Sequence, residues 1–247
     1  MLSTRTIKAA IAIAAVSMAL TACSSKSDEI AEQTNREVAA SKSIADPAAA
    51  LAKLDAQLKV GRDELQRDCD FGCGDLSHAI LKLLDERNAR IKQAVDKLTA
   101  DMLTKYYEDS DAYSLQDTLA PRILAAAEAS RGASGDRSLL RITGDIVREG
   151  KYVIRNSDKA TEWYARAWLA GDKQAAANNA AIYESVHDLN NAYLWALRCM
   201  GVCRADNGSG MYRVVDPDSL RSRLSAAAIR QAEQAATDTT VLALAGR

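Results

Sequence analysis

Two stretches of this 247-residue chain match each other at a fixed spacing. Residues 160–163, Ala-Thr-Glu-Trp, align with residues 192–195, Ala-Tyr-Leu-Trp, at an offset of 32 residues. The same offset places Arg166 over Arg198. A spacing of this size is typical of repeated helical pairs, in which each repeat buries its apolar face by stacking against its neighbours. The match therefore predicts two stacked copies of one helical unit.

Upstream of these residues the offset changes. Residues 144–147 align with residues 180–183 at an offset of 36 residues, so the loop in the second copy is shorter by 4 residues. Each copy is expected to consist of a helix, a loop and a second helix, with small residues where the helices approach. The aromatic side chains of this region are expected to fill the gaps between the helices.

Composition supports an all-α fold. The chain has 3 prolines and 1 phenylalanine, it is rich in alanine, the strongest helix former, and runs of β-branched residues are few. A helical hairpin is expected over residues 46–109. Asp46 and Pro47 form a helix start, because aspartate caps and proline fits the first turn. The second helix of the hairpin is expected to run from Asp75 to about Tyr107, because apolar residues recur there at helical spacing.

The N-terminal residues have the order of an export signal. Arg5 and Lys8 precede an apolar run over residues 9–20, which is shorter than the roughly 20 residues that a spanning helix needs. Residues 1–22 are therefore expected to be cleaved. The Leu-Thr-Ala sequence before Cys23 resembles the lipobox of bacterial lipoproteins, in which the cysteine is acylated. An ordinary signal peptide is the alternative.

This resemblance implies a lipid anchor on Cys23. Because Ser24 follows the cysteine, it also implies the outer membrane, facing the periplasm, if the cell is Gram-negative. Residues 23–45 are mostly polar and small, and they are expected to form a flexible tether. A helix on the surface of the folded body, over residues 28–39, is the alternative.

Four further cysteines form two pairs of equal spacing, Cys69 with Cys73 and Cys199 with Cys203. Export places them in an oxidising compartment, where disulfides are the default. A glycine within each pair lets the backbone leave helical geometry and bring the sulfur atoms together. Local bridges are therefore favoured over cross-pairing between the two sets. A zinc site is a further alternative, although the usual ligand spacing puts two residues between the cysteines of at least one pair.

Residues 138–199 resemble the Sel-like repeat, a relative of the tetratricopeptide repeat that stacks helical pairs into a solenoid. The residues that carry this resemblance are Gly144, Gly150, Asp158, the Glu-Trp-Tyr-Ala-Arg-Ala segment at 162–167, Gly171 and Asp172. The second copy departs from the pattern, because Ala180 stands where glycine is usual. Residues 224–236 resemble the helix that closes such arrays, and residues 111–130 are a candidate first pair. A short solenoid with a closing helix is therefore expected over residues 110–247.

The resemblance implies an adaptor or scaffold that binds an envelope protein, with no cofactor and no enzymatic activity. A cell-wall-associated enzyme, or an inhibitor of such an enzyme, is the alternative. Aromatic residues in these repeats either fill the core or face a ligand. Trp163 and Trp195 are expected in the core, whereas Trp168 and Tyr193 are candidate partner-binding residues.

Nucleic-acid binding and catalysis find little support in the sequence. The formal net charge of −1 leaves no excess of Lys and Arg for nucleic acid. The histidines are His78 and His187. His78 is close in sequence to the first cysteine pair, but a single histidine at a helix start is more often an exposed residue without a catalytic role. Neither catalytic nor metal-ligating residues are expected.

The lipid anchor leads to the first prediction. Cys23→Ser removes the sulfur that would be acylated, so the protein should leave the membrane fraction, because each acyl CH₂ contributes about 0.8 kcal/mol to membrane binding. Fractionation of cells that express the wild type or the variant, followed by immunoblotting, measures this. Retention of the variant in the membrane fraction at the wild-type level would contradict the anchor.

Overall fold

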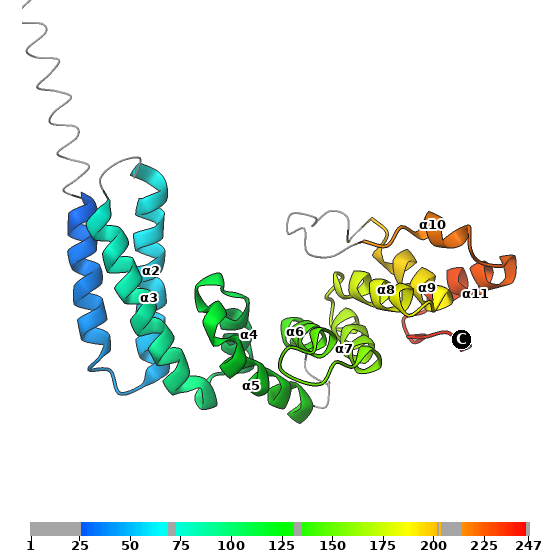
Figure 1. The fold of residues 1–247 in the computed structure, drawn as a ribbon, viewed down its shortest axis with the longest axis horizontal. Helices are drawn as coiled ribbons and strands as arrows, with labels where there is room; N and C mark the ends of the chain where they lie inside the picture. Colours follow the sequence, from blue (N-terminus) through cyan, green and yellow to red (C-terminus); the bar gives the residue numbers. More distant parts are fainter. Residues whose placement is uncertain (1–25, 69–72, 131–134, 202, 204–213, 246–247) are drawn as a thin grey trace, which may run out of the picture. The chain divides into compact units, whose positions relative to one another are not determined.

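The computed structural model describes residues 26–68, 73–130, 135–201, 203 and 214–245. Every regular element in these ranges is helical (Figure 1), which confirms the all-α prediction. The chain divides into two compact units, Met1–Leu98 and Thr99–Arg247. None of the described helices is both long and apolar enough to cross a membrane. The signal region and Cys23 lie outside the described residues.

The described part of the first unit contains three α-helices. Residues 26–41 are helical, α2 spans Pro47–Asp68 and α3 spans Gly74–Ala94. Figure 1 shows the first of these, in blue, beside α2 and α3. The start of α2 agrees with the prediction, because the carboxylate of Asp46 accepts two backbone N–H groups of the first turn at 3.2 and 3.3 Å.

The flexible tether expected over residues 23–45 is wrong for the part that the structure describes. Ala31 is buried in one apolar core with side chains of α2 and α3. Gln57 of α2 donates a hydrogen bond of 2.8 Å to the hydroxyl of Thr34. The sequence signal was weak because the buried positions of this helix, such as Thr34 and Ser41, are small or polar. The helical alternative is the correct one, and the helix is packed rather than frayed.

The second helix of the hairpin ends before the predicted Tyr107. A 3-10 turn, η1 (Val95–Lys97), follows α3, and Leu98 is extended, with φ −68° and ψ 137°. Thr99 then starts α4 (Ala100–Glu108), because its hydroxyl accepts a backbone N–H of the first turn at 3.4 Å. Apolar residues keep their helical spacing across this break, so the sequence pattern did not predict it. The hairpin therefore ends with the first unit.

The second unit consists of helices that pack in consecutive pairs. In addition to α4, its elements are η2 (Ser110–Leu115), α5 (Gln116–Ala129), α6 (Arg137–Glu149), α7 (Ser157–Leu169), α8 (Ala175–Ser185), α9 (Leu189–Cys199), α10 (Pro217–Arg221) and α11 (Ala226–Ala236). α4 packs on α5, α6 on α7 and α8 on α9, while α7 packs on α8. The two matching sequence copies are thus the α6–α7 and α8–α9 pairs.

The sequence predictions agree with the structure at the C-terminal end of this array and differ from it at the N-terminal end. The closing helix expected over residues 224–236 is α11, which packs on α9. Residues 111–130 do not form a helical pair of their own. They contain most of η2 and the single helix α5, which pairs with α4 instead. The predicted boundary at residue 110 therefore falls within a pair.

The α6–α7 pair is matched in shape around one glycine. A Cβ added at Gly144 would lie 2.7 Å from a ring carbon of Tyr164, whose side chain is completely buried. The equivalent positions in the α8–α9 pair are Ala180 and Ala196, which are also buried. In the α6–α7 pair, a glycine leaves room for a large ring. In the α8–α9 pair, the two equivalent positions each hold a methyl group. Glycine is not required at position 180, because position 196 holds alanine where the first pair has Tyr164.

Gly144→Ala should destabilise the second unit. Alanine has a higher helix propensity than glycine by about 1 kcal/mol, but an extra group in a packed core costs about 1–3 kcal/mol. Because the Tyr164 ring is fully buried and has no room to move aside, the cost should lie near the upper end of this range, so we expect a net loss of about 1–2 kcal/mol in the free energy of unfolding. Gly135→Ala is the matched control, because no atom lies within 4 Å of a Cβ there. Equal stability of the two variants in denaturant titrations would contradict the tight contact.

Candidate binding site

Three side chains from α7 and α9 form a compact group, which we call the Trp–Arg cluster. The rings of Trp168 and Trp195 meet edge to face, with centroids 5.5 Å apart and planes at 86°. The guanidinium carbon of Arg198 lies 4.5 Å from the ring centroid of Trp168 and 4.7 Å from that of Trp195. Trp195 and Arg198 are three positions apart on α9, so they share one face of that helix.

The two candidate partner-binding residues have different environments. Trp168 is partly buried against the core of the second unit and keeps some exposed surface. Tyr193 is only 2% exposed, and its hydroxyl donates a hydrogen bond of 3.3 Å to Glu233 of α11. Burial, followed by the charge of Glu233, raises the pKa of Tyr193. Tyr193 is therefore a core residue, and its assignment to a partner-binding face is wrong because α11 covers it.

The two remaining tryptophans lie in the core. Trp163 is 3% exposed and Trp195 is 0% exposed. The guanidinium carbon of Arg166 lies 4.9 Å from the ring centroid of Trp163, as Arg198 lies beside Trp195 one repeat later. Each copy therefore places an arginine against the tryptophan three positions before it. The arginine and tryptophan of the second copy also contact Trp168, which belongs to α7 of the first copy.

Arg198 also binds the chain at and beyond the end of α11. Its Nη2 donates hydrogen bonds to the backbone carbonyls of Ala235, Asp238 and Val241, at 3.1, 2.8 and 2.6 Å. Burial lowers the pKa of Arg198, and the charge of Asp238 acts in the opposite direction. Arg198 thus connects the Trp–Arg cluster to residues 237–245, which we call the C-terminal segment.

Asn191 holds the same segment further along. Its Nδ2 donates to the carbonyl of Leu244 at 3.3 Å, and its Oδ1 accepts the backbone N–H of Leu244 at 2.6 Å. Asp188, the cap of α9, accepts a hydrogen bond of 2.8 Å from the same Nδ2 and so orients the amide. Asn191 precedes Arg198 by about two helical turns, so both lie on one face of α9. That face binds the C-terminal segment through its backbone.

A cleft remains between α11 and the C-terminal segment. Its volume is about 560 Å³, which is within the usual range for ligand pockets. Polar and apolar side chains line it, among them Gln231, Gln234, Val241 and Leu244. The cleft lies next to the segment that Arg198 binds.

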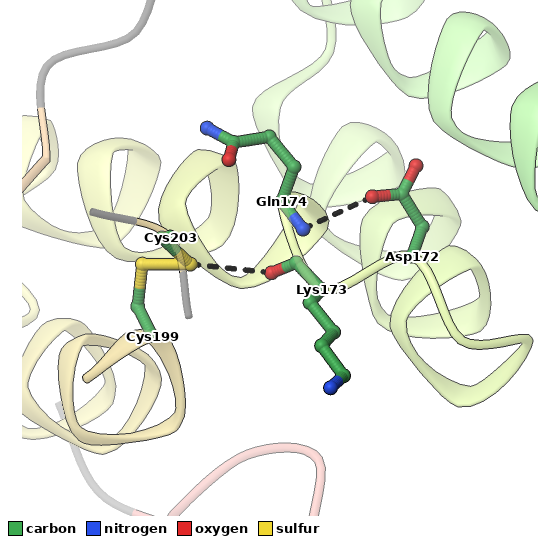
Figure 2. Close-up of a disulfide and its surroundings, with 5 residues drawn as sticks. All are labelled: Asp172, Lys173, Gln174, Cys199 and Cys203. Atoms are coloured by element: carbon green, nitrogen blue, oxygen red, sulfur yellow. Dashed lines mark hydrogen bonds between the residues drawn. A yellow bond between two sulfur atoms is a disulfide. The ribbon is translucent and has the colours of Figure 1, made fainter. Parts of the chain in front are cut away.

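Figure 2 shows the disulfide between Cys199 and Cys203 at the end of α9. Their Cα atoms are 5.1 Å apart, and both residues are buried. The Cys203 sulfur lies 3.3 Å from the carbonyl oxygen of Lys173, in the turn between α7 and α8. Because a disulfide sulfur carries no hydrogen, this is a packing contact. Cys73 is also disulfide-bonded, and Cys69 lies outside the described residues. Cys199 and Cys203 thus form a local bridge and are not cross-paired with the first set.

A charged cluster that the sequence did not indicate joins α4, α6 and the turn after α7. Arg141 of α6 pairs with Glu108, with Asp145 at 3.2 Å and with Asp172 at 3.1 Å. Asp172 also accepts the backbone N–H of Gln174 at 3.0 Å (Figure 2). Burial alone would lower the pKa of Arg141, but the three carboxylates raise it. Arg141 and Asp145 are four positions apart on one helix, a spacing that suits an ion pair, but Glu108 and Asp172 are too distant in sequence for the cluster to be predicted.

The histidines are not part of these clusters. His78 is in the first unit, where its Nδ1 lies 2.9 Å from the carbonyl oxygen of Gly74, one turn earlier in α3. His187 is in the turn between α8 and α9, with φ 61°. Over the described ranges, no group of three or more His, Cys, Asp and Glu residues is arranged to hold a metal ion.

Comparisons of the chain with protein-family models, with curated proteins and with solved structures gave no match. The function therefore has to be inferred from the residues of the chain itself.

Asp145→Asn should change how stability depends on pH. Burial raises the pKa of Asp145 above its ordinary value of 3.8, while the Tyr164 hydroxyl and the charges of Arg141 and Arg148 oppose this. A carboxyl group whose pKa is raised on folding stabilises the fold below the ordinary value, and this contribution is lost as pH rises through the folded pKa. As pH rises above about 4, the wild type should therefore lose stability relative to the variant.

Denaturant titrations at several pH values measure this difference. Glu162→Gln, at an exposed position on α7, is the control for losing a carboxylate. A stability difference between wild type and Asp145→Asn that stays constant across these pH values would contradict the raised pKa.

Proposed function

We propose that this protein is a lipid-anchored interaction module of a bacterial envelope assembly. The anchor rests on the sequence before Cys23, which resembles a lipobox. The interaction role rests on the second unit, where helices packed in consecutive pairs present side chains of successive repeats to a partner. The resemblance to Sel-like repeats, which serve as scaffolds, supports the same role.

The observation that carries the interaction role is the partial exposure of Trp168. Its ring contacts both Trp195 and Arg198, so its orientation is restrained before a partner binds. Tryptophan and arginine are enriched at interface hot spots. A side chain that is already ordered loses little conformational freedom when it binds. Trp168 is therefore suited to act as an anchor for a partner.

Two further apolar side chains are exposed at the ends of α7 and α9. Leu169, which follows Trp168, is 52% exposed. Met200, at the position equivalent to Trp168 in the second copy, is 59% exposed. Both copies therefore end their second helix with an apolar side chain open to solvent, although hydrophobic burial favours covering such groups. A partner that covers both ends would gain from this burial.

Trp168→Ala should remove the partner without releasing the protein from the membrane. Chemical crosslinking in intact cells, followed by purification and mass spectrometry, measures the proteins recovered with the wild type, with Trp168→Ala and with Cys23→Ser. We expect one set of envelope proteins with the wild type and a loss of about tenfold or more with Trp168→Ala, as for a hot-spot residue. Cys23→Ser should lose the same set because it leaves the membrane.

Tyr113→Ala is the matched control, because it removes an aromatic side chain that is 62% exposed and lies on η2, outside the Trp–Arg cluster. It should retain the partners. Thermal denaturation must show that both aromatic variants are folded. Equal recovery of partners with Trp168→Ala and the wild type, or equal loss with Tyr113→Ala, would contradict the assignment.

A further inference from the structure

The C-terminal segment, residues 237–245, lies on α9 in the manner of a bound peptide. Two of its backbone carbonyls accept hydrogen bonds from Arg198 at 2.8 and 2.6 Å. Both backbone groups of Leu244 pair with the amide of Asn191, at 3.3 and 2.6 Å. In each of these contacts the segment contributes only backbone atoms. Main-chain recognition of this kind is open to any peptide of suitable conformation, with side chains adding specificity.

The segment is held at the surface rather than within the core. None of its residues is fully buried. Its apolar side chains, Val241, Leu242 and Leu244, are only partly buried against the core of the second unit. Segments with few buried apolar contacts open at a lower free energy than the core helices. We therefore expect the segment to open at a lower free energy than the paired helices.

The segment also carries its own turn. The Asp238 carboxylate accepts the backbone N–H of Thr240 at 2.9 Å and the hydroxyl of the same residue at 2.7 Å. Such local hydrogen bonds favour a turn without help from the rest of the protein. A free peptide of this sequence would thus be partly prepared for binding. The cleft of about 560 Å³ beside it leaves room for a ligand that extends further.

We propose that the face of α9 carrying Asn191 and Arg198 is a binding site for a non-helical peptide segment with apolar side chains. The protein's own C-terminal segment fills this site, and a protein partner displaces it by offering backbone groups at the same positions. That a protein partner binds at this site rests on the proposed function. That α9 binds such a peptide is independent of the proposed function.

A tethered segment competes strongly with any free peptide. A short flexible connection gives an effective concentration on the order of millimolar, so the intact protein should bind added peptide weakly. Weakening the internal segment without touching α9 should uncover the site. Val241→Asp with Leu244→Asp does this, because it places charges at side chains that pack against the core. We call this protein the released variant.

The probe is a fluorescent synthetic peptide with the sequence of residues 236–245, Ala-Thr-Asp-Thr-Thr-Val-Leu-Ala-Leu-Ala. Fluorescence anisotropy measures its binding to the full-length wild type and to the released variant. We expect the released variant to bind at least about tenfold more tightly, because the internal competitor is weakened. Equal binding by the two proteins, or no binding by a folded released variant, would overturn the proposal.

Two controls test the backbone contacts themselves. Adding Arg198→Lys to the released variant keeps the positive charge but removes the guanidinium fork, and it should weaken binding by about tenfold. A peptide that is N-methylated at the position of Leu244 keeps every side chain but lacks the N–H that Asn191 accepts. It should bind at least about tenfold more weakly. Undiminished binding of the methylated peptide would show that α9 does not bind the backbone.

Hydrogen exchange on the wild type tests the same idea if the released variant fails to fold. The backbone N–H of Leu244 should exchange through local opening, faster than the N–H groups of α9 and with little dependence on denaturant. Exchange of Leu244 only together with α9 would mean that the segment never vacates the site, and the proposal would fail.

The outcomes also separate this proposal from the proposed function. Peptide binding is measured with purified protein, so it does not depend on partners in the cell. Binding of the probe together with failed crosslinking would leave the peptide site standing and remove the envelope assembly. Crosslinked partners that depend on Trp168, together with no probe binding, would leave the interaction role standing and remove the peptide site.

Discussion

The packing of the second unit depends on how closely the two helices of each pair can approach. In the α6–α7 pair the buried ring of Tyr164 occupies the space that a side chain at Gly144 would need. In the α8–α9 pair the equivalent positions hold two alanines, Ala180 and Ala196. Close packing requires facing positions to change together, because both overfilled and empty space cost stability. The repeat therefore tolerates the loss of its glycine in one copy.

Local signals in the sequence were sufficient for much of the fold. The start of α2 at Pro47 follows from a cap and apolar spacing within a few residues, and α11 was expected from the resemblance of residues 224–236 to the helix that closes Sel-like arrays. The errors came from elements whose partners are distant or whose buried residues are not large and apolar. Residues 26–41 bury small and polar side chains, and the break at Leu98 lies inside an unbroken apolar pattern. Tyr193 was misassigned because α11, which covers it, is distant in sequence.

Arg141 and Arg198 have different environments, and the sequence did not predict this difference. Arg141 binds three carboxylates, Glu108, Asp145 and Asp172. Arg198 binds backbone carbonyls and two indole rings, which act on a cation through partial charges only. A network of full charges fixes its members strongly. The looser environment of Arg198 is the one at which an exchange of ligands is physically reasonable.

If Cys23 carries a lipid, the helix over residues 26–41 limits how far the folded protein can stand from the membrane. A flexible coil of about 20 residues would place the folded body roughly 25 Å away. Only Ser24 and Ser25 separate Cys23 from the helical residue Lys26, and a fully extended chain covers at most about 3.6 Å per residue. A lipid on Cys23 would therefore keep the start of this helix within about 11 Å of the headgroups. Any protein that contacts the start of this helix would then have to come close to the bilayer surface.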